Sequence, residues 1–221
     1  IKSILNTIVE PNSGSSYSER EKILWGNDYI NEQIGNYTYK ISSNSFFQTN
    51  SAQAKILYDL IIHCGEFKKN EIVYDLYCGT GTIGIYIANF VKMVYGVEIV
   101  MSSIIDAIEN ANNNNVNNIE FMQGNLDLFF NENNESKIIP RPDTIILDPP
   151  RAGLHRNTSI KLIEMEAKKI IYVSCNPSTQ VRDIVLFMEN GYKLKYVQPV
   201  DMFPHTPHIE NIAVLTKWKI K

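Results

Sequence analysis

The stretch E-I-V-Y-D-L-Y-C-G-T-G-T-I-G, residues 71–84, decides the fold class of this chain. Its first part, residues 72–76, is a short apolar run that predicts a buried strand. The spacing Gly79-x-Gly81-x-x-Gly84 follows and opens an apolar segment that predicts a helix. Glycines between a strand and a helix allow a tight turn and close backbone contact with a nucleotide. The stretch therefore predicts an α/β fold whose first loop binds a nucleoside.

Two acids and an amide flank this predicted site. A second predicted strand, residues 93–97, ends at Glu98, and an acid there can bind both hydroxyls of a ribose in NAD-binding and S-adenosylmethionine-binding domains alike. Asp75, at the end of the first strand, is more typical of the methyl-donor group, whose loop must accommodate a methionine tail. Asn125 follows a third predicted strand, residues 119–123, and two interpretations stay open for it: a contact with adenine, or a turn amide.

The segment D-T-I-I-L-D-P-P-R-A-G, residues 143–153, is a second chemical signal. A predicted buried strand ends in Asp148, and two prolines then fix a rigid, extended turn. Such a strand end suits a carboxylate and carbonyl groups that must be held at a site. Arg151, His155 and Arg156 follow, and this basic cluster is a candidate for holding phosphate.

A third signal is I-I-Y-V-S-C-N-P, residues 170–177, in which a predicted strand ends at Ser174 and Cys175 follows. Pro177 suits the first turn of a helix. A thiol at a strand-to-helix junction lies at the carboxyl edge of the sheet, where open α/β folds bind ligands. A helix N-terminus there also favours the thiolate. The alternative from this stretch alone is a small buried cysteine at a strand end.

Two polar loops complete the set of candidate site residues. In S-S-N-S-F-F-Q-T-N, residues 42–50, Gln48 and Asn50 can fix a polar ligand and the phenylalanines can stack on a ring, while a capped helix start is the local alternative. The loop D-M-F-P-H-T-P-H-I-E, residues 201–210, precedes a strand predicted at residues 212–218. Its two histidines lack a third ligand with suitable spacing, so no metal is expected.

Composition and length narrow the class of protein. The chain has 221 residues, of which 44% are hydrophobic and 20% charged, as in an ordinary soluble domain. No apolar run is long enough to span a membrane, and no secretory signal is visible. Three cysteines without a C-x-x-C pair fit the cytoplasm and argue against a zinc or iron–sulfur site. The net charge of −3 gives no overall signature of nucleic-acid binding.

The N-terminal part differs in pattern from the rest. Residues 1–41 alternate between short apolar and polar stretches with turn signals, which predicts a small antiparallel piece attached to a main domain of residues 42–221. The chain begins at Ile1 rather than Met, which suggests a fragment of a longer protein. The asparagine-rich run 112–118 is predicted to be a solvated helix end without a function.

Five segments, taken in order, resemble the RNA uracil-5-methyltransferases, the enzymes that make 5-methyluridine in ribosomal and transfer RNA. They are F-F-Q-T-N (46–50), D-L-Y-C-G-T-G (75–81), L-D-P-P-R-A-G (147–153), S-C-N-P-S-T-Q-V-R-D (174–183) and F-P-H-T-P-H-I-E (203–210). The resemblance implies an α/β, class I S-adenosylmethionine-dependent methyltransferase fold. This fold is Rossmann-like, with a seven-stranded, mostly parallel sheet, a last antiparallel strand and, here, a small antiparallel N-terminal extension.

The resemblance also implies a role for each matching residue. Cys175 would be the nucleophile and Glu210 the general base. The cofactor, S-adenosylmethionine, would be held by Gln48, Tyr77, Gly79, Gly81, Thr82, Glu98, Asn125 and Asp148. The target base would meet Phe47, Asp148 and Arg151, and no metal is implied. Thr82 stands where the family often has asparagine.

The implied reaction is methylation of carbon 5 of a uridine in RNA through a covalent Cys175–uracil adduct, with 23S rRNA the favoured target and tRNA the alternative. RNA would be the partner of the full-length protein, because the N-terminal RNA-binding β-barrel of many members has no counterpart in this sequence. A cytoplasmic monomer without a membrane partner is expected.

Three other functions remain open from the residues alone. The first is an amino-group N-methyltransferase that uses the D-P-P motif. The second is a cytosine-5 enzyme, in which the thiol usually follows a proline directly, whereas Ser174 precedes it here. The third is a non-catalytic RNA-binding module that keeps the fold.

Overall fold

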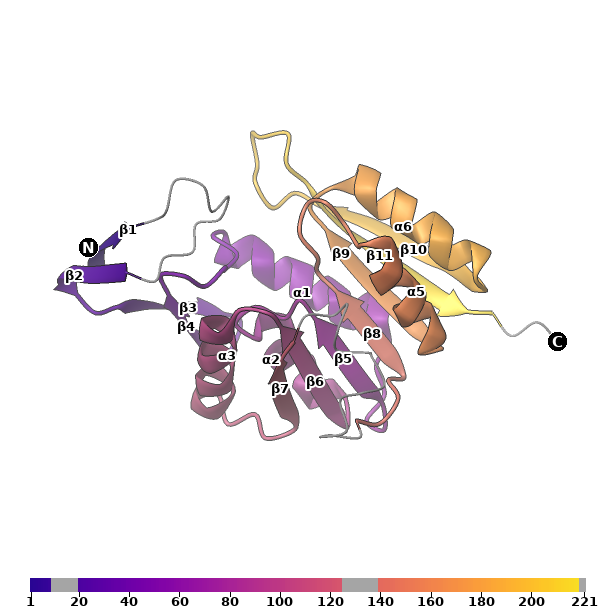
Figure 1. Ribbon diagram of the computed structural model, residues 1–221, viewed down its shortest axis with the longest axis horizontal. Coiled ribbons are helices and arrows are strands. Elements are labelled where there is room, and N and C mark those ends of the chain that lie inside the picture. The colour runs from indigo at the N-terminus through magenta and orange to yellow at the C-terminus, as the bar shows by residue number, and fades with distance from the viewer. Residues whose placement is uncertain (9–19, 125–138, 219–221) are drawn as a thin grey trace.

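The computed structural model describes residues 1–8, 20–124 and 139–218, so Asn125 lies outside the described residues. Figure 1 shows the described elements along the chain. They are β1 (Ser3–Ile8), β2 (Arg20–Gly26), β3 (Tyr29–Ile34), β4 (Tyr37–Ser42), α1 (Ser51–Gly65), β5 (Ile72–Leu76), α2 (Thr82–Ile87), the 3₁₀ turn η1 (Ala88–Phe90), β6 (Met93–Glu98), α3 (Met101–Asn113), β7 (Ile119–Gln123), β8 (Thr144–Leu147), α5 (Arg156–Glu164), β9 (Lys169–Ser174), α6 (Pro177–Glu189), β10 (Tyr192–Val200) and β11 (Glu210–Lys217). Within these ranges no helix combines the length and apolar character needed to cross a membrane.

Seven strands form one central sheet in the order β10-β11-β9-β8-β5-β6-β7. β5 pairs in parallel with β6 and β8, and the parallel ladder continues to β7 and β9. β11 is antiparallel to both of its neighbours, β9 and β10. The pairs β1–β2 and β3–β4 form two small antiparallel sheets. The predicted α/β fold, with its mostly parallel seven-stranded sheet and antiparallel N-terminal piece, is confirmed.

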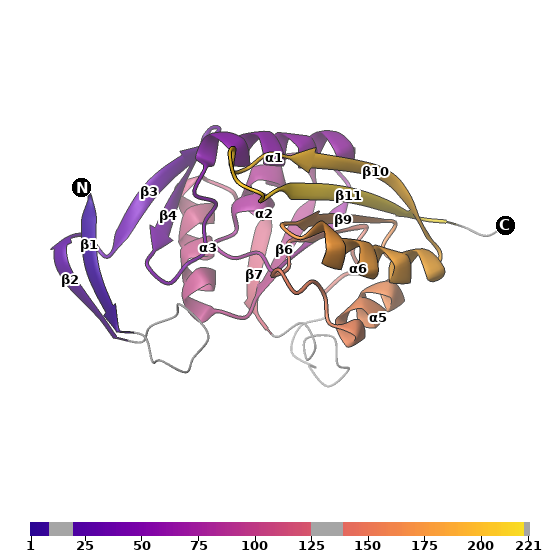
Figure 2. The ribbon, with the colours of Figure 1, turned by 90° about the horizontal axis from the view of Figure 1, so that it is seen from above.

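Each face of the central sheet has its own hydrophobic core. Side chains alternate between the faces of a strand, so on β9 Ile171 and Val173 lie in one core while Ile170 and Tyr172 lie in the other. Helices α1 and α2 pack on the first core, and α5 and α6 pack on the second. Figure 2 shows α1 on the opposite side of the sheet from α5 and α6. Burial of both faces explains why these strands are almost continuously apolar in sequence.

A ladder of polar side chains docks β4 on α3. Asp106, Asn110 and Asn114 lie one helical turn apart and hydrogen-bond the backbone of alternate β4 residues, from Ser42 to Thr38. Four helical residues advance about 6 Å and two strand residues about 6.6 Å, so the two repeats match. The prediction that the asparagine-rich run is only a solvated helix end is therefore wrong at Asn114, whose amide bonds both backbone groups of Thr38.

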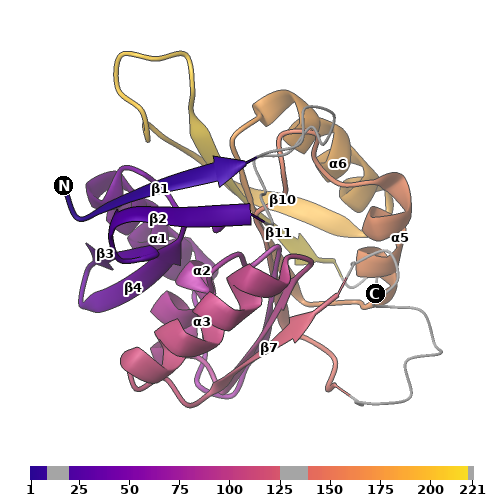
Figure 3. The same cartoon turned by 60° about the vertical axis from the view of Figure 1, so that its left-hand side comes forward.

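Two surface features stand apart from the sheet. The β1–β2 hairpin exposes large apolar side chains, among them Ile4, Ile23 and Trp25. The loop of residues 201–209, between β10 and β11, projects beyond the carboxyl edge of the strands, as Figure 3 shows. This loop carries His205 and His208, and it leads directly into Glu210, the first residue of β11.

Two elements differ from the sequence prediction. Helix α5 is not predicted from the sequence, because its buried face includes Thr158 and Ser159 and so hides the apolar period. β11 begins at Glu210, two residues earlier than predicted, and Glu210 is buried. The residue expected in a polar loop is therefore the first residue of a buried strand.

Candidate active site

Four acids and one thiol lie along one edge of the central sheet. Asp75 is on β5, Glu98 ends β6, and Asp148 and Cys175 directly follow β8 and β9. The carboxyl ends of parallel strands share one edge. β11 runs the opposite way and therefore begins at that edge, with Glu210 as its first residue. The fold thus aligns five residues that the sequence analysis found in five separate segments.

The loop between β5 and α2 has the backbone that its glycines predict. Tyr77, Gly79 and Gly81 have φ angles of 63°, 52° and 78°, in the left-handed region. A Cβ added at Gly81 would lie 2.6 Å from the Phe121 ring, so packing requires this glycine. A Cβ at Gly79 would meet nothing within 4 Å, which leaves open space beside the loop. The left-handed Tyr77 costs about 1–3 kcal/mol, a strain that is typical of ligand sites.

Glu98 is tied to the backbone around this loop. Its Oε2 accepts a hydrogen bond from the Gly79 N–H at 3.1 Å. Its Oε1 accepts from the N–H groups of Ile99 at 2.8 Å and Val100 at 3.0 Å. The carboxylate therefore joins the end of β6 to the glycine loop and to the start of α3.

Asp75 lies fully buried beneath the same loop. Its Oδ2 accepts from the Gly84 N–H at 2.8 Å, while its Oδ1 is buried with no hydrogen-bond partner among the described residues. Burial raises the pKa of Asp75 to about 7; the Gly84 hydrogen bond opposes this, and the charges of Asp148 and Glu98 add to it. An unpaired buried oxygen is costly, and a ligand donor would satisfy it. The orphaned oxygen and the open space at Gly79 fit a nucleoside cofactor with an amino-acid tail.

The remaining predicted cofactor contacts lie around the start of α1 and α2. Thr82 begins α2, and its hydroxyl accepts from the buried Tyr58 of α1 at 2.9 Å. Gln48 is buried in the loop before α1. Asn50 caps the N-terminus of α1 and donates to the carbonyl of Met202 at 3.0 Å. Asn50 is therefore a helix cap, which was the local alternative to a ligand contact. Its hydrogen bond to Met202 also ties the loop before α1 to the start of loop 201–209.

The two phenylalanines of this loop have different environments. The ring of Phe47 packs against the core, with its centroid 6.0 Å from that of Tyr39. Phe46 is 72% exposed, so it presents the free aromatic surface at this position. The sequence pattern alone does not separate the two, because they are adjacent and equally apolar.

The antiparallel ladder between β9 and β11 places Cys175 and Glu210. The last pair of this ladder is Asn211 opposite Ser174, so Glu210 directly precedes it on β11 and Cys175 directly follows it after β9. A buried amide pair holds this register. Gln180 of α6 donates to the backbone carbonyls of β9 and of Asn211 at 2.8 and 3.1 Å, and Asn211 donates back to Gln180 at 2.5 Å.

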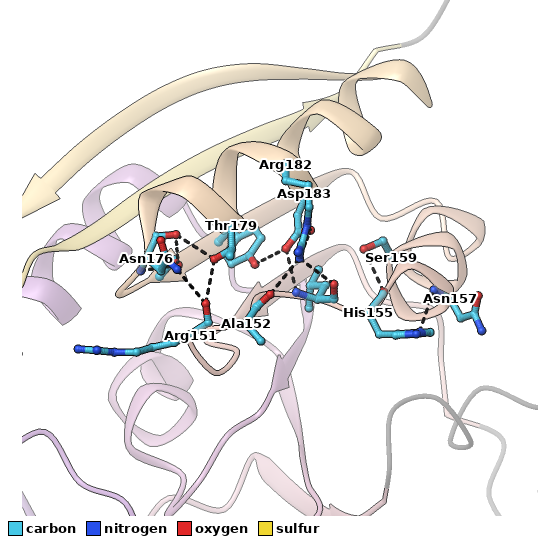
Figure 4. Close-up of polar contacts among 12 residues, drawn as sticks. Arg151, Ala152, His155, Asn157, Ser159, Asn176, Thr179, Arg182 and Asp183 are labelled. Carbon is cyan, nitrogen blue, oxygen red and sulfur yellow. Dashed lines mark hydrogen bonds and ion pairs between the residues drawn. The ribbon is translucent and has the colours of Figure 1, made fainter.

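The turn after β8 is clamped to α6 through its own backbone, as Figure 4 shows. The carbonyl of Arg151 accepts from Nδ2 of Asn176 and from the hydroxyl of Thr179, both at 3.1 Å. Asn176 also caps α6 by accepting from the N–H of Ser178, and Pro177 occupies the first turn as predicted. The backbone position of Arg151 is thus fixed relative to the Cys175 junction.

Two further residues of α6 hold the next part of this turn. Arg182 donates to the carbonyl of Leu154 at 3.0 Å, and Asp183 accepts from the Leu154 N–H at 2.8 Å and from the Tyr172 hydroxyl at 2.7 Å. Gly153 has φ 72°, and a Cβ there would lie 2.6 Å from the Asp183 carboxylate. These roles of Arg182 and Asp183 are not among the predictions from the sequence. The sequence pattern that could have revealed these roles is the spacing of Thr179, Arg182 and Asp183 within S-C-N-P-S-T-Q-V-R-D, which places the three polar side chains on one face of α6.

The side chain of Arg151 leaves the clamp and points away from α6 in Figure 4. Its Nη2 lies 3.1 Å from Nδ1 of His208 in loop 201–209. His155 instead caps α5, with its Nδ1 accepting from the N–H of Asn157 at 3.4 Å. The predicted basic cluster of Arg151, His155 and Arg156 is therefore divided, with Arg151 at the thiol side and the other two at the start of α5.

Burial sets the protonation behaviour of the reactive groups. It raises the pKa of Cys175, the charge of Glu210 adds to the rise, and the Arg151 guanidinium opposes it through hydrogen bonding and charge. Burial raises the pKa of Glu210 to about 7, with Asp148 adding to the rise and Arg151 opposing it. Burial also raises the pKa of Asp148 to about 7. Arg151 is thus the cation that favours the charged form of both Cys175 and Glu210.

Comparison with known proteins points to one family. The family model described as tRNA (Uracil-5-)-methyltransferase matches residues 15–218. An uncharacterized RNA methyltransferase of Oceanobacillus iheyensis is 41% identical over 223 residues, which cover 98% of this chain and 47% of that protein. One from Clostridium tetani is 42% identical over 214 residues, which cover 97% of this chain and 46% of that protein. The chain spans about half the length of these relatives.

The solved structures that resemble this chain include RNA methyltransferases. The Pyrococcus abyssi tRNA (uracil-54, C5)-methyltransferase in complex with S-adenosyl-L-homocysteine is 36% identical, with a TM-score of 0.77 over 97% of this chain and 51% of that chain. The M. jannaschii tRNA m1G37 methyltransferase has a TM-score of 0.64 at 14% identity, over 90% of this chain and 60% of that chain, which shows the fold alone. The expected methyltransferase fold is confirmed.

Proposed function

The chain belongs to the tRNA (uracil-5-)-methyltransferase family, as its motifs predict, and we propose that it methylates carbon 5 of a uridine in RNA with S-adenosylmethionine as cofactor. The observation that carries the proposal is that Cys175 and Glu210 directly flank the last pair of the β9–β11 ladder, close enough for the charge of Glu210 to act on the thiol. Methylation at this ring carbon needs a nucleophile that adds to the ring and a base that later removes a proton. The ladder supplies one of each at the carboxyl edge of the sheet.

The reaction follows from the chemistry of uracil, whose carbon 5 is a poor nucleophile. The Cys175 thiolate adds to carbon 6, and the ring electron pair moves toward carbon 5 and the oxygen on carbon 4, which gives an enolate. S-adenosylmethionine, when bound, supplies an electrophilic methyl group for carbon 5. The Glu210 carboxylate then takes the proton from carbon 5, the sulfur–carbon bond breaks, and Cys175 leaves as thiolate. The methyl group replaces the proton, which ends on Glu210.

The protonation behaviour of Glu210 supports its assignment as base. A carboxyl with a pKa of about 7 is part ionised at neutral pH and is a stronger base than an ordinary glutamate. Its Oε2 is buried and has no hydrogen-bond partner among the described residues, so it is free to accept a proton. The raised pKa of Cys175 means that the thiolate needs help from a nearby cation, and Arg151 supplies that help.

We assign the cofactor to the edge formed by the glycine loop and Glu98. The open space beside Gly79 and the orphaned oxygen of Asp75 support this placement. The Pyrococcus abyssi relative was crystallised with S-adenosyl-L-homocysteine, which supports the same cofactor here. The other residues assigned to the cofactor are Gln48, Tyr77, Gly81, Thr82 and Asp148.

The target base reaches such a site only after leaving its stack. We assign Asp148 and Arg151, which lie near the Cys175 thiol, to contacts with the target uracil. Phe47 is assigned to the same contact surface, where its ring packs against the core and holds the loop before α1 in place. The exposed ring of Phe46 adds a surface on which a base can stack. The substrate is a uridine of ribosomal RNA, 23S rRNA first, or of transfer RNA, and nucleoside analysis of the two RNA classes separates them.

The test is nucleoside mass spectrometry of ribosomal and transfer RNA from a strain that lacks the gene. Loss of 5-methyluridine from one fraction, restored by the full-length wild-type protein but not by its Cys175→Ser variant, is the expected result. It would also name the RNA class. Unchanged 5-methyluridine in both fractions would contradict the proposed function.

A further inference from the structure

We infer that His208 is a positioning residue, which holds the Arg151 guanidinium against the Cys175 thiol by accepting its hydrogen bond at Nδ1. The inference rests on the proposed function for its meaning in catalysis. The contact itself is independent of it, because Arg151 Nη2 lies 3.1 Å from His208 Nδ1 whatever the reaction is. None of the motif assignments gives His208 a role.

The geometry fixes Arg151 at both ends. Its carbonyl is held by Asn176 and Thr179 at 3.1 Å each, so the backbone cannot drift from the start of α6. A long arginine side chain still has several rotatable bonds beyond such an anchor. The contact with His208 removes that freedom at the guanidinium end and selects the position beside Cys175.

His208 is itself placed by the structure of loop 201–209. Its N–H donates to the hydroxyl of Thr206 at 3.2 Å, and that hydroxyl donates to the carbonyl of Phe203 at 2.7 Å. The base of the loop is tied to the start of α1 through the bond from Asn50 to Met202. The exposed imidazole therefore has a defined backbone under it, two residues before Glu210.

The chemistry of the two groups fixes the tautomer. A guanidinium has donors and no acceptor, so Nδ1 of His208 must be the acceptor and the ring proton must be on Nε2. Loss of this acceptor therefore leaves the guanidinium without its hydrogen bond to His208.

The charges around this contact determine the sign of the effect. Cys175 at the end of β9, Glu210 at the start of β11 and Asp148 after β8 lie on the site side of Arg151, and Glu210 and Asp148 both disfavour the thiolate. Arg151 opposes them. If Arg151 moves away from Cys175, its opposing charge is lost and the thiolate fraction falls.

The test measures Cys175 directly, without RNA or cofactor. Alkylation of the 221-residue chain by iodoacetamide is followed from pH 5.5 to 9 by peptide mass spectrometry, which reads Cys175 and Cys64 separately. Cys64 is the internal reference. His208→Ala removes the acceptor, His208→Asn keeps an acceptor oxygen at the place of Nδ1 without a titrating ring, and His205→Asn is the matched control in the same exposed loop.

At pH 7.5 we expect His208→Ala to slow alkylation of Cys175 about threefold to tenfold. A rise of about half to one in the pKa of Cys175 lowers its thiolate fraction by that factor. His208→Asn and His205→Asn should stay within about twofold of wild type on the same scale. Equal rates for wild type and His208→Ala, or a His208→Asn variant as slow as His208→Ala, would overturn the inference.

A second measurement separates this inference from the proposed function. Full-length protein carrying each variant is assayed for 5-methyluridine formation. We expect His208→Ala to lower kcat, with rescue by His208→Asn. If the alkylation shift is present but neither wild type nor any variant makes 5-methyluridine, the positioning role holds and the proposed function fails. If wild type methylates RNA and His208→Ala alkylates and turns over normally, the proposed function holds and the positioning role fails.

Discussion

The Gly79 N–H donates to Oε2 of Glu98 over 3.1 Å, which joins the loop after β5 to the end of β6. The other oxygen of Glu98 accepts from Ile99 and Val100. A carboxylate has about four lone-pair directions, so one remains for a ligand. A ribose that uses both hydroxyls must therefore displace one backbone N–H. Gly79 is the partner expected to move, because space is open beside it.

Substitution of Glu98 tests the cofactor site. We expect Glu98→Ala to weaken binding of S-adenosyl-L-homocysteine by about 1–3 kcal/mol, because ribose hydroxyls lose a charged acceptor. Glu98→Gln, which keeps one acceptor oxygen, should lose less. Isothermal titration calorimetry gives both values, and Glu164→Ala, on the exposed end of α5, is the control. An affinity unchanged in Glu98→Ala would place the ribose elsewhere.

In the proposed reaction Cys175 and Glu210 act at different steps, so their loss should differ in kind. In full-length protein, Cys175→Ser should give neither methylation nor a covalent complex, because a hydroxyl has no thiolate character. Glu210→Gln should allow addition and methyl transfer but block removal of the proton from carbon 5. The enzyme would then stay joined to RNA and survive denaturing electrophoresis, only with S-adenosylmethionine present. Normal turnover by Glu210→Gln would mean that another group is the base.

Stability should depend on pH through the buried carboxyls. Burial raises the pKa of Glu210 from 4.5 to about 7, so between these values the folded chain holds a proton that the unfolded chain has lost. The free energy of unfolding should therefore fall as the pH rises from about 5 to about 8. Glu210→Gln should reduce this fall by about 1–3 kcal/mol, part of it remaining through Asp75 and Asp148.

Urea unfolding at the two ends of this pH range measures the effect. Glu164→Gln is the control, because this side chain is exposed and its removal should leave the pH dependence as in wild type. If Glu210→Gln and wild type lose equal stability between about pH 5 and pH 8, then Glu210 is not a buried group that binds a proton on folding.

The polar ladder between α3 and β4 should be measurable as stability. Asn110 is fully buried, accepts from the Lys40 N–H at 2.6 Å and donates to the carbonyls of Lys40 and Thr80 at 3.1 and 3.2 Å. Asn110→Ala leaves these backbone groups unpaired, and we expect it to cost about 2–4 kcal/mol in urea unfolding. Asn112→Ala, on the exposed face of the same helix, should change stability by less than about 0.5 kcal/mol. Equal effects of the two would show that the ladder contributes nothing.

The residues to which we assign the chemistry could be placed at one edge of the sheet from sequence, because their local context is strong. Gly79 and Gly81 follow an apolar run, and Cys175 and Asp148 each end one, so strand, loop and helix could be placed without knowing the tertiary fold. The parallel order of β5, β6, β8 and β9 then required their carboxyl ends to share an edge.

The residues that sequence reasoning missed act through distant backbone. Asn114 looks like low complexity, and only the structure shows that it pairs with Thr38, 76 residues away. His208 looks like part of a solvated loop until Arg151 is seen to approach it. No local pattern reports such partners, because the period of α3 or the composition of a loop is the same whether its polar groups meet water or another strand.

The β9–β11 ladder makes the position of Cys175 relative to Glu210, the proposed nucleophile and base, a property of the sheet rather than of the loop that joins β10 to β11. The tip of that loop can therefore gain or lose residues without moving Cys175 relative to Glu210. An insertion inside β11 has the opposite effect, because a shift of one residue turns every side chain to the other face. The loop tip nevertheless has its own constraint, because an insertion that breaks the bonds of Thr206 to Phe203 and to His208 removes the support of the imidazole while the two strand positions stay in place.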